Sequence, residues 1–304
     1  MKNENKKNSK KAIKIFIILV LLFAILFVLD EIFFSPKNNT QNINTDNTIQ
    51  NTENEEISKQ EPKTDLKIEY INAGQADCTI IENNGQVMLI DTGSKEQEEN
   101  TVNYIKNKNI AKINYIFITN PNEEHIGGLK KILENFEVEN IYLPSVQINS
   151  ELFIDSVVAI QDKGLKIKSP EEGAIFKLGD AACNIVSAKV EPQDINYSSI
   201  IIKITYGEKR FLFMSDAETK TETEEDWEDI DVLKVGNHGS DMGTSVEFLD
   251  QTKPEFAIIT TDQNTKPDIL SRLENIGATI YNTNQNGTIT LTTNGKDINI
   301  EKEK

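Results

Sequence analysis

The side chains best suited to metal or acid–base chemistry lie in a few short stretches of this chain. The chain contains only two histidines, His125 and His238. Histidine is the commonest side-chain ligand of a catalytic zinc ion, so this scarcity limits any such site. Three aspartates, Asp77, Asp91 and Asp216, each follow an apolar run closely and stand beside small residues. Imidazoles and carboxylates both bind transition metals and both transfer protons.

Predicted strands precede most of these stretches. Segment 66–71 alternates apolar and polar residues, and strands at 78–82 and 86–90 flank Asn83-Asn84-Gly85, a hairpin signal. Strands are also predicted at 114–119, 199–206, 210–214, 232–235, 256–260 and after Ala278, and helices at 100–108, 128–135, 245–251 and 267–276. Interleaved strands and helices predict sheets with helices packed on their faces.

Several ordered motifs together carry a family resemblance. They are Asn72–Asp77, Leu89–Gly93, Thr119–Gly128, Asn196–Ser199, Phe213–Glu218 and Lys234–Ser240. In this order they resemble the metallo-β-lactamase superfamily, and more closely the extracellular domain of ComEC-type DNA-uptake competence proteins and their free-standing relatives. The resemblance covers the chain from about Leu66 to the C-terminus. It implies an α/β fold, the αββα metallo-β-lactamase sandwich, with a metal site at one edge of its two sheets.

The resemblance also shows where this chain departs from the family's first metal site. That family normally carries histidine or aspartate ligands where this chain has Asn120 and Asn122. An amide oxygen is a neutral, hard ligand and a weak one for zinc. We therefore expect the first site to be lost.

The second metal position is better preserved. The resemblance assigns four ligands to it: Glu124, His125, Asp216 and His238. Two carboxylates and two histidines suit one zinc, manganese or iron ion, and four protein ligands suit a closed structural site. The alternative is that these residues are inherited and hold no ion.

Three departures affect this second position. Glu124 is one methylene longer than the aspartate expected there. The family's paired histidines are replaced by Asn237-His238, so if the first of the pair is the ligand, Asn237 occupies its place and His238 lies behind it. A further family histidine corresponds to Lys266.

Two hypotheses about function follow. The first is a non-catalytic or weakly active module that binds an unknown ligand or protein of the cell envelope. The second is a single-metal hydrolase of a phosphodiester or ester in the envelope, or of extracellular DNA, in which Asp216 holds the ion and Asp77 or Asp91 takes a proton. Asp91 has a simpler interpretation, in which it orients the ligand loop through hydrogen bonds.

The N-terminal part of the sequence predicts membrane attachment. A basic tail (1–11) precedes an apolar segment (12–34), and a polar spacer (35–64) separates it from the folded domain (65–304). Such a segment is about long enough to span a bilayer, and the preceding lysines place the N-terminus in the cytoplasm and the domain outside. A cleaved signal peptide is the alternative. The spacer contains almost no apolar residues and is expected to be disordered.

The net charge and the two cysteines bear on the possible partners and on a possible disulfide bond. The formal net charge is −17, which disfavours nucleic acid as a partner because phosphate binding needs a basic face. Cys78 and Cys183 could pair as a disulfide if the domain is exported, or each could be a small buried residue within a strand.

Overall fold

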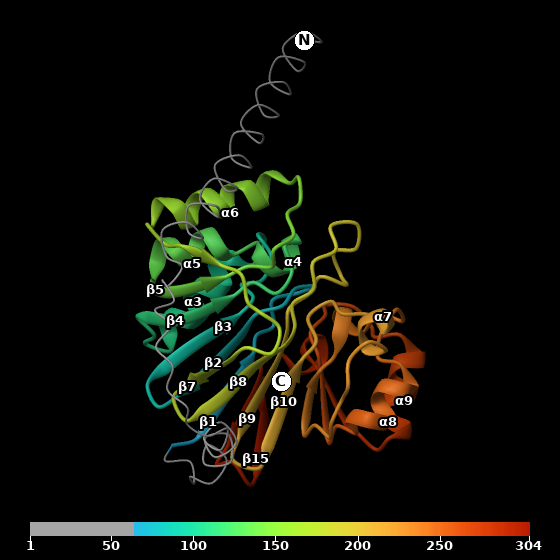
Figure 1. The fold of residues 1–304 in the computed structure, drawn as a ribbon. Helices are drawn as coiled ribbons and strands as arrows, with labels where there is room; N and C mark the ends of the chain where they lie inside the picture. The colour runs from blue at the N-terminus through green and yellow to red at the C-terminus, as the bar shows by residue number, and fades with distance from the viewer. Residues whose placement is uncertain (1–63) are drawn as a thin grey trace, which may run out of the picture. The chain divides into compact units, whose positions relative to one another are not determined.

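The computed structural model describes residues 64–304, which form two β-sheets stacked face to face between two layers of helices (Figure 1). The first sheet has eight strands in the order β15-β14-β1-β2-β3-β4-β5-β6. Their bounds are β1 Leu66–Tyr70, β2 Thr79–Asn83, β3 Gln86–Ile90, β4 Lys112–Phe117, β5 Glu137–Tyr142, β6 Ile167–Lys168, β14 Ile289–Thr293 and β15 Ile298–Lys302. The second sheet has seven strands in the order β13-β12-β11-β10-β9-β8-β7. Their bounds are β7 Ile175–Leu178, β8 Ala181–Ser187, β9 Ile201–Tyr206, β10 Lys209–Phe213, β11 Val232–Lys234, β12 Phe256–Ile259 and β13 Thr279–Asn282.

Each sheet is antiparallel in one part and parallel in the other. Strands β2 and β3 form a tight hairpin whose turn residues Asn84 and Gly85 both have positive φ, at 51° and 76°. From β3 to β6 the strands run parallel, as do those from β10 to β13. Parallel strands need crossover connections, and their carboxyl ends gather at one edge of the sheet.

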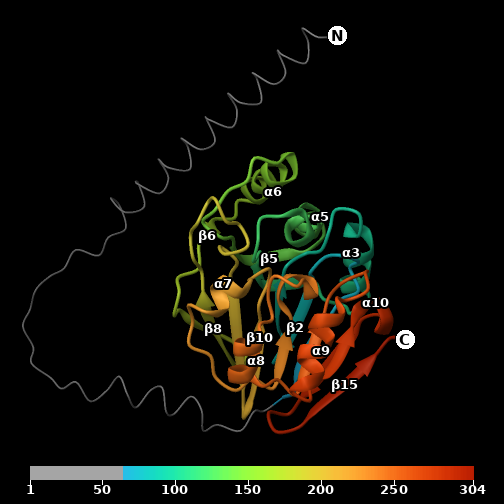
Figure 2. The same ribbon diagram turned by 90° about the vertical axis from the view of Figure 1, so that its right-hand side faces the viewer.

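Helices α3 to α9 supply these crossovers, and α10 lies between β13 and β14. Their bounds are α3 Glu98–Asn107, α4 Glu123–Ile126, α5 Leu129–Asn135, α6 Glu151–Asp162, α7 Thr219–Glu222, α8 Val246–Thr252, α9 Pro267–Asn275 and α10 Thr283–Asn286. Helices α3, α5 and α6 pack apolar side chains such as Ile105 and Leu133 on the outer face of the first sheet. Helices α8 and α9 cover the outer face of the second sheet with Phe248 and Leu273 (Figure 2).

A third apolar core lies between the sheets. Side chains of β1, β3 and β4 face those of β8, β9, β10 and β11 there, with Phe117 from one sheet and Phe213 from the other. Burial of apolar area on this scale is the main stabilising term of such a fold. The αββα sandwich expected from the motifs is therefore the architecture of residues 64–304.

The predicted strands and helices from 66 to 135 and from 199 onward agree with the structure. Strands β5 to β8 and helices α4, α6, α7 and α10 were not predicted. Cys78 and Cys183 are free, buried thiols in two different apolar cores, which matches the alternative without a disulfide.

The predicted tail and membrane segment, 1–34, lie outside the described residues, as does nearly all of the predicted spacer. Within the part of the chain that the structure describes, no helix combines the length and apolarity that crossing a bilayer requires.

Candidate metal centre

The chemically capable side chains meet at the strand ends of both sheets. Asp77 lies in the loop between β1 and β2, and His125 lies in the short helix α4 that follows β4. Asp216 follows β10, and His238 lies in a single turn of 3₁₀-helix, Gly236–Gly239, after β11. One potential ligand atom from each of these four residues lies within 4.8 Å of the others. All four are buried, with exposed fractions from 0% for His125 to 8% for His238.

Both histidine rings are held in the orientation that a metal ligand needs. The Nδ1–H of His125 donates to Asp91 Oδ2 at 2.9 Å, and the Nδ1–H of His238 donates to the carbonyl oxygen of Thr260 at 2.9 Å. A carboxylate and a carbonyl are acceptors, so each Nδ1 carries a proton, and in the neutral form of each ring Nε2 then offers a lone pair. Such outer partners fix the tautomer and direction of metal-binding histidines.

Three buried atoms of this group have no hydrogen-bond partner: His125 Nε2, Asp216 Oδ1 and His238 Nε2. They face one another, because His125 Nε2 lies 3.0 Å from Asp216 Oδ2 and His238 Nε2 lies 3.5 Å from Asp216 Oδ1. Two ligands of a tetrahedral zinc at ordinary bond lengths are separated by about 3.3 Å. Buried polar atoms are normally satisfied, so buried ligand atoms that converge at this spacing fit the coordination of a cation.

Asp77 differs from the other three members. Its carboxylate accepts hydrogen bonds from Lys234 Nζ and from Thr260 Oγ1, one on each oxygen. Lys234 is itself only 3% exposed, although it is a lysine on the short strand β11. The structure therefore adds Lys234 and Thr260 to the site. The sequence signal for Lys234 was its place as a charged residue within the apolar run Val232–Val235.

Backbone conformation around the centre is unusual. Asp91, Ser215, Asn237 and His238 all have positive φ, between 44° and 63°. Residues other than glycine adopt this conformation at a cost, and such residues concentrate at functional sites. Two of them, Asp91 and His238, take part in the hydrogen bonds that orient the histidine rings. The conformational strain therefore lies within the candidate centre itself.

Asn120, one of the two positions assigned to the first ion, is engaged in hydrogen bonds within the protein. The Nδ2 of Asn120 donates to Ser199 Oγ at 3.2 Å, and its Oδ1 accepts from the backbone N–H of Asn122 at 3.0 Å. The Asn120 amide thus joins the loop after β4 to the start of β9. Asn120 is completely buried, so these bonds use its polar atoms in place of ligation.

The remaining predicted residues lie around this group. Glu124 is half-buried and is not among the four grouped side chains; its backbone oxygen accepts from the N–H of Asp77. Asn237 donates through Nδ2 to Glu218 Oε1 at 2.8 Å, and Asn196 donates to the same oxygen. Lys266 is exposed at the start of α9.

The electrostatics favour the charged forms of His125, Asp216 and Asp77. Burial lowers the pKa of His125, but Asp216 and Asp91 outweigh it and hold that pKa well above its ordinary value. Burial raises the pKa of Asp216 and of Asp77, yet the imidazoles and Lys234 outweigh it and keep both pKa values low. Burial does raise the pKa of Asp91, against the effect of His125. Without a metal ion, His125 is therefore held as an imidazolium.

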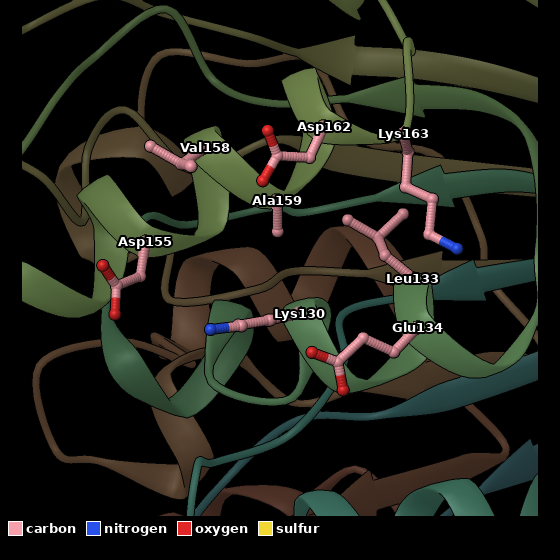
Figure 3. A pocket seen from close by; sticks show the side chains of 8 residues that line it. All are labelled: Lys130, Leu133, Glu134, Asp155, Val158, Ala159, Asp162 and Lys163. Carbon is pink, nitrogen blue, oxygen red and sulfur yellow. The ribbon is translucent and has the colours of Figure 1, made fainter.

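A separate shallow pocket of about 180 Å³ lies between α5 and α6 (Figure 3). Its lining mixes lysines such as Lys130 with acids such as Asp155, around Leu133 and Val158. None of its residues belongs to the buried histidine–aspartate group, so this pocket is no part of the candidate centre.

Known proteins match this chain in both sequence and fold. ComE operon protein 3 of Bacillus subtilis is 25% identical over 252 residues, which cover 73% of this chain and 32% of that protein. Recombination protein 2 of Haemophilus influenzae is 28% identical, covering 67% of this chain and 25% of that protein. The chain therefore spans about a third and a quarter of the length of these two relatives.

Solved structures give the same architecture. The metallo-β-lactamase fold protein YhfI from Bacillus subtilis has a TM-score of 0.55 and 10% identity, covering 76% of this chain and all of YhfI. The metallo-beta-lactamase superfamily matches residues 71–261, a span that includes Asp77, His125, Asp216 and His238. This chain belongs to the metallo-β-lactamase superfamily, and its curated relatives are of the ComEC type.

Proposed function

We propose that this protein is a membrane-anchored, extracytoplasmic member of the ComEC-like group of metallo-hydrolases that has lost the first metal site and binds one ion at the second. In this proposal it acts outside the cell mainly as a binding module, with little or no catalysis. The apolar segment 12–34 and its preceding lysines support the anchor and its direction.

The observation that carries the one-metal site is the pair of oriented histidines. Asp91 and Thr260 occupy the Nδ1 atoms, and both Nε2 atoms point without partners toward Asp216. His125, Asp216 and His238 would hold the ion, and nitrogen and oxygen donors suit zinc, manganese or iron. When bound, such an ion lowers the pKa of a coordinated water and polarises a substrate oxygen.

The loss of the first ion is supported by Asn120. Its amide is committed to two hydrogen bonds inside the protein, one of which reaches across to Ser199. Freeing it would leave buried polar atoms unpaired, which is costly. A single ion cannot clamp both the attacking and the leaving oxygen of a phosphodiester, as paired ions do, and this favours weak or absent hydrolysis.

The alternative is an active single-metal hydrolase of a phosphodiester or ester in the cell envelope, or of extracellular DNA. The bonds made by Asp77 favour it, because they leave three protein ligands, and three-ligand zinc sites are those with a position open to water. The net charge of −17 opposes DNA as the substrate.

The test is metal content. The full-length chain, purified in detergent, is compared with the double variant Asp216→Ala/His238→Ala and with a surface control, Asp162→Ala at the exposed end of α6. We expect about one equivalent of zinc, manganese or iron in the wild type and in the control, and none in the double variant. A wild type that stays metal-free after incubation with each ion would sink the proposal.

Hydrolysis distinguishes the alternative from the main proposal. The metal-loaded wild type is assayed on bis(p-nitrophenyl) phosphate and on p-nitrophenyl esters, with the double variant as the background. Turnover that the double variant lacks supports the single-metal hydrolase. Equal, background-level rates in both proteins support the binding module.

A further inference from the structure

A buried lysine stands inside the candidate metal centre and engages one of its four grouped carboxylates. Lys234 is at the end of β11, 157 positions from its partner Asp77. Both are at most 4% exposed in their side chains, and Thr260 Oγ1 holds the second oxygen of the same carboxylate. Burying an unpaired lysine costs free energy, so the ion pair with Asp77 must account for the buried position of Lys234.

The pairing separates Asp77 from the other three members of the group. His125, Asp216 and His238 each keep a buried atom without a hydrogen-bond partner, whereas neither oxygen of Asp77 is in that state. A charge-assisted hydrogen bond from an ammonium to a carboxylate is among the stronger ones in proteins. A metal ion that recruited Asp77 would have to compete with this bond.

We infer that Lys234 is a positioning residue that holds Asp77 outside the coordination of the ion, so that three protein ligands and one open position remain. This inference rests on the proposed one-metal site. In this inference, Lys234 determines whether the centre is open, and can admit water or a ligand, or closed with four protein ligands.

Formal charge agrees with this assignment. In the metal-bound state, where both imidazoles are neutral, the three aspartates Asp77, Asp91 and Asp216 and the ammonium of Lys234 carry a formal charge of −3 + 1 = −2. One divalent cation brings it to zero. Without the ammonium the group would carry −3, so a divalent cation would be held more tightly and Asp77 would be free to bind it.

The experiment uses the full-length protein with zinc for affinity and with manganese(II) for water content. Zinc affinity is measured by competition with a chromophoric chelator. Water on bound manganese is measured from the relaxation of solvent protons. Lys234→Met should bind zinc at least about tenfold more tightly and should show a smaller relaxation enhancement than the wild type, because Asp77 displaces one water; a tenfold change corresponds to about 1.4 kcal/mol. Lys234→Arg, which keeps the charge and the donor, should resemble the wild type.

A charge-balanced variant keeps the inference testable if Lys234→Met fails to fold. Asp77→Asn/Lys234→Met removes the pair and leaves the formal charge at −2. If Asp77 is not a ligand, this variant should bind zinc within about fivefold of the wild type and should keep the bound water. A loss of about a hundredfold, or a larger relaxation enhancement in this variant than in the wild type, would show that Asp77 is a ligand and would overturn the inference while leaving the one-metal site intact.

Failure of the proposed function looks different. If the wild type binds neither ion, the one-metal site is wrong. If Lys234→Met then gains an ion, the ammonium takes the place of the metal, and both the proposed function and the inference about Asp77 are overturned.

Discussion

At the scale of single residues, the centre depends on where protons lie. Asp91 and the Thr260 carbonyl set the tautomers of His125 and His238, and Asp216 lies between their Nε2 atoms. None of the three groups that could hold the ion needs a new rotamer for its lone pairs to converge. The protein thus holds the ligands in place in advance, which reduces the cost of ordering them on binding.

The role of Asp91 as an orienting residue can be tested directly. Asp91→Asn keeps the shape but weakens the acceptor for His125 Nδ1–H, so zinc affinity should fall by about 10- to 100-fold. Competition with a chromophoric chelator measures this change. Asp162→Asn, at the surface, should have no effect. A loss of all binding would mean that Asp91 is itself a ligand.

Metal binding should release a proton near neutral pH. The raised pKa of His125 means that the metal-free protein holds an imidazolium, and the ion needs the neutral ring. Below that raised pKa, metal affinity should therefore increase with pH, by up to about tenfold per unit. Calorimetry in buffers of different ionisation enthalpy counts the protons, and a count of zero at pH 7 would contradict the assignment.

The same pKa shifts set the stability of the metal-free protein. His125, with a raised pKa, stabilises the fold below its unfolded pKa of about 6.5, and this contribution is lost as pH rises through the folded value. Asp216, with a lowered pKa, stabilises the fold above about pH 4, and this is lost as pH falls through its folded value. Chelator-treated protein should therefore be most stable between these limits.

At the scale of elements, short loops and helices carry the four grouped side chains. Gly127 and Gly128 lie between α4, which contains His125, and α5. A Cβ on Gly128 would lie 2.3 Å from the backbone oxygen of Thr92, and one on Gly127 would lie 2.3 Å from the backbone nitrogen of Lys95. These glycines therefore admit the loop that follows β3.

Gly128→Ala should therefore disturb both the fold and the centre. No side-chain rotation relieves a clash with backbone, and we expect a loss of about 3 kcal/mol in the free energy of unfolding, with weaker zinc binding. Gly164→Ala is the control: its Cβ meets nothing within 4 Å but its φ is +70°, so strain alone should cost about 1 kcal/mol. Urea unfolding measures both, and equal losses would rule out the steric explanation.

At the scale of the whole molecule, the centre joins the two sheets. His125 and its partner Asp91 come from the first sheet, and Asp216 and His238 come from the second. A ligand that binds only the folded state stabilises it in proportion to the logarithm of its concentration over Kd. An ion held by these residues would therefore link metal content to the stability of all described residues.

Zinc at about a thousand times its Kd should add about 4 kcal/mol, or raise the melting temperature by roughly 8–16 °C. A chelator should reverse the rise. The variant Asp216→Ala/His238→Ala should not respond to either treatment. Thermal denaturation followed by circular dichroism measures the shift, and an equal rise in that variant would mean that zinc acts elsewhere.

Local patterns in the sequence were sufficient for the strands of both sheets that lead into the site. The hairpin around Asn84-Gly85 and the apolar runs before Asp91, Thr119 and Asp216 each carry their own signal. The segment from β5 to β8 did not carry such a signal. It includes β7 at the end of the second sheet, where Ile175 is 62% exposed. A strand with one open edge and an exposed apolar residue has a weaker burial pattern.

The sequence by itself determined the family, the sandwich and three of the four grouped residues, His125, Asp216 and His238. Each of these residues lies in a short motif that can be read from neighbouring residues in the chain. Only the tertiary structure decided that Asp77 joins them in place of Glu124, and that Lys234 and Thr260 engage it. These contacts bridge the two sheets across more than half of the chain. No local pattern encodes which charges the stacking of two sheets will bring together, so the balance of charge at the centre is a property of the fold.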